Sequence, residues 1–401
     1  MTNKKYIILK YKQKILSLLF HDNRLLHANA EDENGSILGN IYIAKVKNIV
    51  KNINAAFVEI EPGVTCFLGL SEVRNPILIN RKYDGRLLAE DEIMVQVRKE
   101  AAKTKPAAVT CSPSLDGRYC VISMGKPGLA YSAKLSLKAR QRIDAALATS
   151  DFSVKEYSRG FGIVIRTNAK ELSGDYTPLI TEIKQLSEEL KYIMDIAGHR
   201  TCYSVLLKKP AGYLTALRDM YTGQYDEIVT DEADIFEQLK AFLADHPEFY
   251  LPAIRLYQDD RLPLYKLYAV EARLDEALNR KVWLKSGGYL IIDPTEALTV
   301  IDVNTGKVTS KKDMEENYFH MNMEAAEEIA IQLSLRNISG IIIVDFINMR
   351  AEEHNKKLMA HFGDLLKRDA IKTKLVDITP LGLVEITRMK TSKPLREQLL
   401  S

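Results

Sequence analysis

The chain has 401 residues, of which 46% are hydrophobic and 27% charged, so it is long enough for two or three domains that each bury a core. The formal net charge of +3 is compatible with a polyanionic partner but does not require one. Four cysteines form no CxxC pair, which argues against a zinc ribbon or a disulfide framework and fits a reducing cytoplasm. No apolar run reaches membrane-spanning length, and Lys10, Lys12 and Lys14 interrupt the apolar N-terminal residues, so we expect a cytoplasmic protein.

The first 112 residues predict short strands. The runs "YIIL" and "ILSLLF" precede the turn "ENGSILG", which is typical of strands followed by a turn. From Gly39 to about Ala108, several further strands follow one another at short spacing, with turns at "KNIN" and "PGV". This spacing predicts a small β-barrel.

The rest of the chain mixes helices and strands. Residues 113–208 combine a strand, "FGIVIRT", with a helix, "YTPLITEIKQLSEELKYIM", and residues 209–277 alternate strand and helix. Residues 278–401 are the most regular, with a hairpin "GYLIIDPTEALTVIDV", a helix, a strand "GIIIVDF", a second helix and two last strands. The spacing of Met323, Ala326 and Ile329 predicts that the first of these helices is amphipathic, with Asn322 as its N-cap.

Two apolar strands of the last part end on an aspartate, Asp302 in "TVIDVNTG" and Asp345 in "GIIIVDFINM". A helix connects them, and such a crossover favours parallel strands in one sheet, so both carboxylates should emerge at the same sheet edge. With the amide of Asn304 they could bind one hard cation, for which Mg²⁺ is the natural candidate. Such a site could generate a hydroxide nucleophile and neutralise charge on a reacting phosphate.

Spacing alone leaves a structural role for these aspartates equally open, since a carboxylate can simply cap the end of a strand. Asp293 also ends an apolar run, but it precedes Pro294 at a turn and is interpreted as a turn residue. In a tight hairpin it lies at the opposite end of the strand pair from Asp302.

The predicted barrel places Phe57 and Phe67 on separate strands, with Tyr42, Lys45, Lys47 and Lys105 as candidate neighbours. Aromatic rings that stack on bases, next to cations that meet phosphates, are the means by which small barrels hold single strands. The sequence alone favours core positions for both phenylalanines. In "IVIRTN", Arg166 and Thr167 follow an apolar run and could bind a terminal phosphate, although an arginine after a strand usually has no such role.

Three long segments resemble the catalytic domain of the ribonuclease E/G family: "SGGYLIIDPTEALTVIDVNTGK", "NMEAAEEIAIQLSLRNISGIIIVDFINM" and "GLVEITRMK". Upstream, "GNIYIAKVKNIVKNINAAFVEIEPGVTCFLGLSEV" is similar to the S1-type RNA-binding domain of that family, and "GFGIVIRTNA" to its 5′-phosphate-sensing segment. The resemblance implies an endoribonuclease that uses Mg²⁺ to cut single-stranded, A/U-rich RNA and leaves a 5′-phosphate and a 3′-hydroxyl.

The fold class expected from this resemblance is α+β and α/β, in several domains. A ribonuclease-H-like domain (1–35 plus 209–277) is split by an S1-like barrel of the OB-fold type (36–112) and a 5′-sensor domain (113–208), and a DNase-I-like catalytic domain (278–401) follows. The expected role is RNA decay and ribosomal RNA processing in the cytoplasm. The expected partners are ribosomal RNA precursors and messenger RNA, with no membrane.

The family's metal ligands fall on Asp302 and Asp345, with Asn304 beside them as a catalytic residue. Its RNA-contacting positions fall on Phe57, Phe67 and Lys105, and its 5′-monophosphate contacts fall on Arg166, Thr167 and Lys372. The last of these is an arginine in the family, so lysine keeps the charge but loses the bidentate geometry. Further departures are Asn348 in "FINM", and Ile331 and Ser334 in "AIQLSLR".

The sequence ends at Ser401, before the family's CPxC-type zinc link, so we expect no zinc-linked tetramer, whereas a homodimer is compatible with it. Two rival functions remain at this point. One is a single-stranded RNA-binding protein without catalytic activity, against which the intact Asp302, Asn304 and Asp345 argue. The other is a metal-dependent phosphatase or exonuclease built on a similar sheet.

Overall fold

The computed structural model describes residues 4–33, 35–101, 105–149, 160–172, 174–219, 225–244, 253–306, 314–369 and 371–400. The chain forms two compact units. Unit 1 consists of Met1–Glu33, Gly223–Asp245 and Leu251–Ser401, and unit 2 of Asn34–Thr222 and His246–Tyr250. Among the described residues, no helix combines the length and the apolarity needed to cross a membrane.

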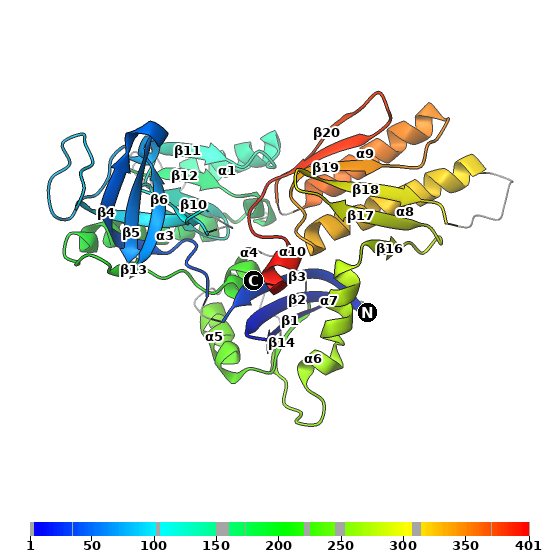
Figure 1. Cartoon of the computed structure of the whole chain (residues 1–401), viewed down its shortest axis with the longest axis horizontal. Coiled ribbons are helices and arrows are strands. Elements are labelled where there is room, and N and C mark those ends of the chain that lie inside the picture. Colours follow the sequence, from blue (N-terminus) through cyan, green and yellow to red (C-terminus); the bar gives the residue numbers. More distant parts are fainter. Residues whose placement is uncertain are drawn as a thin grey trace. The chain divides into compact units, whose positions relative to one another are not determined.

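Unit 1 contains a five-stranded sheet in the order β15-β14-β1-β2-β3 (Figure 1). Its strands are β1 (Lys4–Tyr11), β2 (Lys14–His21), β3 (Arg24–Asp32), β14 (Glu227–Thr230) and β15 (Ala253–Leu256). The first three are antiparallel neighbours, whereas β14 runs parallel to β1 and β15 parallel to β14. The run from Tyr6 to Leu9 is wholly buried, which explains why it is continuously apolar. Helices α5 (Ala233–Ala244), α6 (Leu264–Leu267) and α7 (Val270–Leu278) belong to this part of the unit.

The second sheet of unit 1 has six strands in the order β16-β17-β18-β19-β21-β20. The strands are β16 (Lys281–Trp283), β17 (Tyr289–Pro294), β18 (Leu298–Asn304), β19 (Gly340–Asp345), β20 (Thr373–Ile378) and β21 (Val384–Arg388). The helices that follow β18 in this unit are α8 (Met314–Leu335), α9 (Glu352–Arg368) and α10 (Leu395–Leu400). The pairing of β18 with β19 is parallel, as the strand-helix-strand order predicts.

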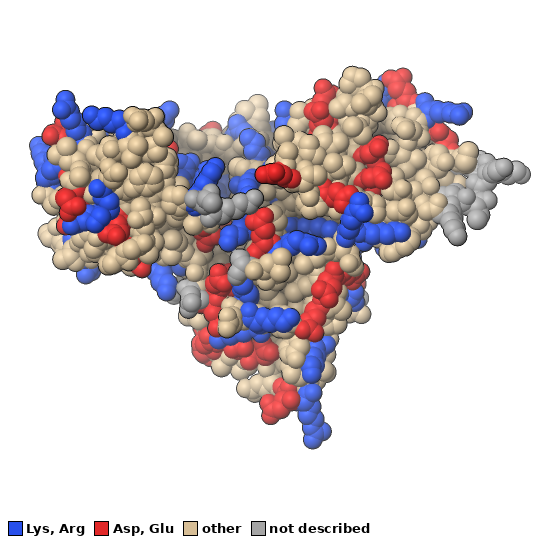
Figure 2. Space-filling view, viewed as in Figure 1, with Lys and Arg blue, Asp and Glu red and all other residues tan. Residues whose placement is uncertain are grey.

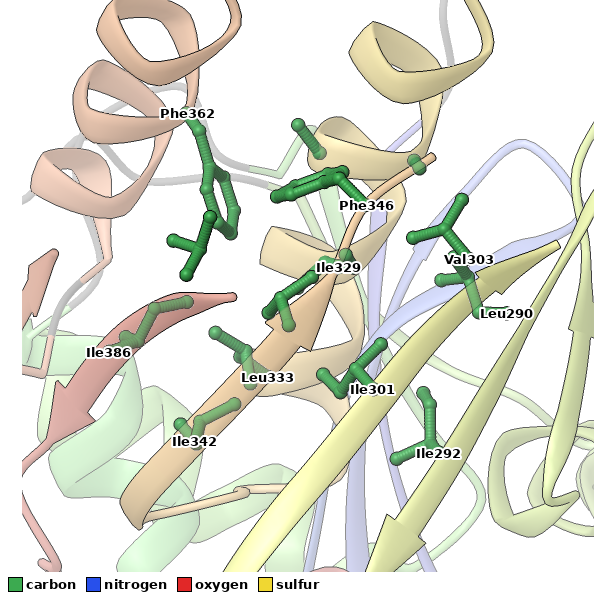
Figure 3. Close-up of a cluster of buried hydrophobic side chains, with 14 of the residues drawn as sticks. Leu290, Ile292, Ile301, Val303, Ile329, Leu333, Ile342, Phe346, Phe362 and Ile386 are labelled. Atoms are coloured by element: carbon green, nitrogen blue, oxygen red, sulfur yellow. The ribbon is translucent and has the colours of Figure 1, made fainter. Parts of the chain in front are cut away.

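The core of this sheet lies on one face, where α8 and α9 cover it. Figure 3 shows Ile301 and Ile342 of the sheet beside Ile329 and Leu333 of α8, with Phe362 of α9 in the same cluster. Along β18, Thr299, Ile301 and Val303 are buried, and the alternating residues between them are only half-buried. The period of two therefore directs Asp302 and Asn304 to the face opposite the helices.

The predicted N-cap of α8 is wrong. The helix begins at Met314, so Asn322 lies in its middle and is fully buried. Its side-chain amide donates to the backbone carbonyl of Ile347 at 2.8 Å and accepts from the amide of the same residue at 3.0 Å. Asn322 thus anchors the chain segment that follows β19, close in sequence to Asp345.

Unit 2 contains the predicted small barrel, and the prediction is confirmed. Strands β4 (Ile41–Val50), β5 (Ala55–Glu61), β6 (Val64–Gly69), β8 (Ala108–Thr110) and β7 (Glu92–Lys99) follow one another around it, and β7 pairs with β4 to close it. A further strand, β13 (Val205–Leu207), pairs with β4. Tyr42 is 2% exposed and belongs to the barrel core, so it is not available as a surface neighbour of the two phenylalanines.

The remainder of unit 2 is a four-stranded sheet in the order β11-β12-β10-β9. It comprises β9 (Ser114–Asp116), β10 (Cys120–Ser123), β11 (Gly128–Tyr131) and β12 (Gly162–Ile165). The helices are α1 (Leu137–Thr149), α3 (Thr177–Ala197) and α4 (Gly212–Asp219), with a 3₁₀ turn at Thr167–Glu171. The apolar face of α3 packs on this sheet through Leu179, Ile183 and Leu190. The domain boundaries given above stay predictions.

Candidate functional site

The two strand-end aspartates lie side by side. Asp302 and Asp345 are directly paired residues in the parallel ladder of β18 and β19. Asp302 is half-buried and Asp345 is exposed, and both alternate with residues that point into the core. The amide of Asn304, two residues after Asp302, donates a hydrogen bond of 2.7 Å to Oδ2 of that carboxylate. This bond within β18 fixes the orientation of the Asp302 carboxylate, which lies beside Asp345 of β19.

The electrostatics of the pair favour a cation. Partial desolvation, and after it the negative charge of Asp302, raises the pKa of the Asp345 carboxyl. A divalent cation between the two would relieve this repulsion. Among the described residues, no group of three or more His, Cys, Asp and Glu side chains is placed to hold a metal ion. Two carboxylates, one amide oxygen and several waters are a donor set that suits Mg²⁺, which keeps water ligands and prefers oxygen.

Asp293, interpreted above as a turn residue, lies within β17, one residue before the strand ends at Pro294. It pairs with Val300 across the hairpin, close to the turn and away from the end of β18 that carries Asp302. Its carboxylate forms an ion pair with Arg280, with Nη2 of the arginine 2.6 Å from Oδ2. This partner neutralises Asp293 without a metal ion.

Phe57 and Phe67 face away from the barrel core. They are directly paired residues of β5 and β6, both half-buried, with ring centroids 6.2 Å apart and an interplanar angle of 80°. Their neighbours along the strands, Val58, Cys66 and Leu68, are fully buried on the other face. The sequence "AAFVEIE" indicates this orientation, because side chains alternate between the two faces of a strand. Phe57 therefore lies on the same face as Glu59 and Glu61, and Val58 lies on the opposite face.

The basic residues around these rings differ in their partners. Lys105 is exposed and lies three residues before Ala108, which pairs with Phe67 across β6 and β8. Lys45 and Lys47 form ion pairs with Glu90 and Glu59, respectively. Of these lysines, Lys105 is therefore the better candidate for a phosphate contact.

The guanidinium of Arg166 is held by a residue that the sequence did not single out. Its Nη1 and Nη2 donate to the two carboxylate oxygens of Asp219, at 2.8 and 2.9 Å, and Nη1 also donates to the carbonyl of Gly117. Arg218 donates to the same carboxylate through Nε at 2.9 Å. Burial opposes the charge on Asp219, but the two arginines lower the pKa of its carboxyl below the ordinary value.

One edge of the Arg166 guanidinium is left for another ligand. Asp219 engages the edge formed by Nη1 and Nη2, and no described residue accepts a hydrogen bond from Nε. The edge formed by Nε and Nη2 can therefore make a second bidentate contact with an anion. Thr167 lies next in the chain, with its hydroxyl 2.8 Å from that of Ser132.

Lys372 belongs to unit 1, whereas Arg166 and Thr167 belong to unit 2. The side chain of Lys372 is exposed. The three predicted phosphate contacts are thus not assembled within one unit.

On the face drawn in Figure 2, Lys and Arg side chains are interspersed with Asp and Glu side chains in both units. Contacts with a polyanion on this face would therefore depend on local groups of residues.

Comparison with known proteins decides the family. The sequence model of the ribonuclease E/G family matches residues 114–391. Ribonuclease G of Salmonella typhimurium is 32% identical over 386 residues, which cover 93% of this chain and 77% of that protein. The chain is a member of the ribonuclease E/G family.

Other relatives in the ribonuclease E/G family are longer. Ribonuclease E of Synechocystis sp. is 32% identical over 98% of this chain and 58% of that protein. Ribonuclease E of Nostoc sp. is 33% identical over 90% of this chain and 52% of that protein. The chain thus spans between half and three-fifths of these two relatives.

Proposed function

We propose that the protein is a Mg²⁺-dependent endoribonuclease that cuts single-stranded, A/U-rich RNA in RNA decay and ribosomal RNA processing. The observation that carries the proposal is the direct pairing of Asp302 and Asp345, with Asn304 bonded to the first of them. Membership in the ribonuclease E/G family supports the same activity. We further propose that the substrates are ribosomal RNA precursors and messenger RNA and that the protein acts in the cytoplasm.

In this proposal Asp302 and Asp345 hold the metal ion, and Asn304 orients the carboxylate of Asp302. When bound, Mg²⁺ supplies a water of lowered pKa and neutralises charge on the scissile phosphate. The products would carry a 5′-phosphate and a 3′-hydroxyl.

Two further places would hold the substrate. Phe57 and Phe67 would stack on bases, next to Lys105, on the outer surface of the barrel. Arg166 would bind a 5′-monophosphate through its Nε and Nη2 edge, with Thr167 and Lys372 as further contacts. The half-exposed rings and the orientation of Arg166 by Asp219 support these roles.

A circular RNA tests the proposed reaction directly. The purified chain is incubated with a circular, single-stranded, A/U-rich RNA in Mg²⁺ or in EDTA, next to the Asp345→Asn variant as the matched control. We expect linear products with the wild-type chain in Mg²⁺ only. Degradation of linear but not circular RNA would mean an exonuclease, and binding of both RNAs without cleavage would mean an RNA-binding protein without activity.

A further inference from the structure

An aromatic pair, one ring exposed and one half-buried, lies with a cation between its rings on the edge strand β16 and its neighbour β17. Trp283 of β16 is 65% exposed, and its ring centroid lies 5.4 Å from that of Tyr289 in β17, at an interplanar angle of 64°. The ammonium nitrogen of Lys281 lies 3.8 Å from the first centroid and 3.7 Å from the second. We call these three residues the Trp283 cluster.

The register of the sheet connects this cluster with the candidate metal site. Trp283 pairs with Tyr289, and Tyr289 pairs with Asn304 on the next strand. Lys281 and Asp302 are likewise joined through a common partner, Ile291. The alternation along β17 and β18 puts all of these residues on the face opposite the helices. Two strand spacings separate the Cα atoms of Trp283 and Asn304, which is roughly 10 Å.

Packing does not account for the cluster. The hydrophobic core of this sheet is built on the other face, from residues such as Leu290, Ile292 and Ile301. Trp283 leaves most of its surface in water on an edge strand, so it contributes little to this core. Among the described residues, no carboxylate forms an ion pair with Lys281, so its charge remains available to an anion.

We propose that the Trp283 cluster binds a nucleotide of a single-stranded RNA beside the metal site, with the base stacked on Trp283 and a phosphate oxygen on Lys281. Any base can stack on an open aromatic face. An adjacent ammonium can donate hydrogen bonds to the backbone phosphate that joins that base to its neighbour. The distance to Asn304 is one that a few nucleotides can span. The location beside a cutting site rests on the proposed function, whereas binding itself does not.

Trp283 is the single tryptophan of the chain, so its fluorescence reports on this cluster alone. The Asp345→Asn variant of the full chain is titrated with a single-stranded A/U-rich oligonucleotide, and separately with inorganic phosphate. We expect saturable quenching by the oligonucleotide and little change with phosphate alone. If the Trp283 emission changed with protein concentration but not with added RNA, a second copy of the chain would cover Trp283. That result would overturn the proposal.

Affinity measurements with a labelled oligonucleotide complete the test. In the Asp345→Asn background, Trp283→Ala should weaken binding by about fivefold or more, and Trp283→Phe should restore most of it. Lys281→Gln should lower the slope of log affinity against log salt by about 0.7. The matched control is Tyr192→Ala, which removes another exposed aromatic ring, on α3, and should leave the affinity unchanged.

The outcomes separate this proposal from the proposed function. If the wild-type chain does not cut RNA but the oligonucleotide still quenches Trp283, the cluster is a binding site and the nuclease proposal fails. If the chain cuts RNA while Trp283→Ala and Trp283→Phe both bind as the parent does, the cluster is not part of the RNA-binding surface.

Discussion

Asp219 engages both terminal nitrogens of Arg166, at 2.8 and 2.9 Å, across 53 positions of sequence. Because this contact uses only one edge of the guanidinium, Asp219 orients Arg166 and leaves the other edge to a phosphate. The carboxylate thereby acts as a positioning group for the proposed 5′-monophosphate sensor.

The first prediction concerns this sensor. Arg166→Ala should bring the ratio of cleavage rates on 5′-monophosphate and 5′-hydroxyl RNA close to one, because charge-assisted bonds worth about 1.5 to 3 kcal/mol each are lost. Asp219→Ala should lower the ratio less, and Lys372→Arg should raise it by restoring bidentate geometry. The measurement is a pair of initial rates on otherwise identical oligonucleotides. A higher ratio in Asp219→Ala would show instead that this carboxylate competes with the phosphate.

The second prediction concerns the metal ligands. Asp302→Asn and Asp345→Asn should each abolish cleavage while RNA binding persists, since the charge of the ligand disappears and the strands stay intact. Mg²⁺ should raise the unfolding temperature of the wild-type chain by mass action and have little effect on either variant. Cleavage at a near wild-type rate by one of the variants would rule out that residue as a ligand.

The third prediction concerns pH. Since the pKa of Asp345 is raised in the folded chain, protons compete with Mg²⁺ for this carboxylate at a higher pH than they would at an ordinary aspartate. The Mg²⁺ concentration needed for half-maximal cleavage should therefore increase as the pH falls through this raised pKa. The check is a series of Mg²⁺ titrations from neutral to acidic pH.

The same raised pKa has a consequence for stability without metal. A carboxyl that resists ionisation in the folded state costs free energy when it is charged, so folding is favoured as the pH falls and Asp345 becomes protonated. In EDTA at neutral pH, Asp345→Asn should therefore unfold at a slightly higher temperature than the wild type. The difference should shrink toward acidic pH, and a lower unfolding temperature of the variant in EDTA would contradict the stated repulsion.

The fourth prediction concerns the barrel. Phe57→Ala and Phe67→Ala should weaken RNA binding by several-fold, because each stacked base is worth about 1 to 3 kcal/mol. Both variants should lose little stability, since the rings lie outside the core. The matched control is Leu68→Ala, which removes a fully buried neighbour and should lower the free energy of unfolding by about 2 to 5 kcal/mol. If the phenylalanine variants lost stability like Leu68→Ala and kept their RNA affinity, the rings would be structural.

The fifth prediction separates structure from function within "GLVEITRMK". Arg388 is 3% exposed, and it donates to Asp369 at 2.7 Å and to the side chain of Asn337 at 2.9 Å. Breaking such a buried pair leaves an uncompensated charge, so Arg388→Met should lower the free energy of unfolding by about 3 to 5 kcal/mol. RNA affinity per folded molecule should stay unchanged. An affinity loss without a stability loss would place Arg388 on the RNA-binding surface.

Much of the candidate metal site follows from the sequence alone. The alternation in "LTVIDVN" puts Asp302 and Asn304 on one face, because side chains along a strand have a period of two. The order strand, helix, strand favours a parallel pair, and this places Asp345 beside Asp302 at the same edge. Both rules act over short stretches of chain, so a single sequence suffices to apply them.

The partners of these residues were decided only by tertiary structure. Nothing local to Arg166 points to Asp219, and nothing in "KVW" indicates that Lys281 lies between two aromatic rings. Asn322, predicted as an N-cap, is instead a buried residue that binds the backbone of Ile347, because the helix begins further upstream, at Met314. Such contacts join residues that are distant in sequence or on adjacent strands, so they depend on sheet register and on the packing of whole elements, which local patterns do not encode.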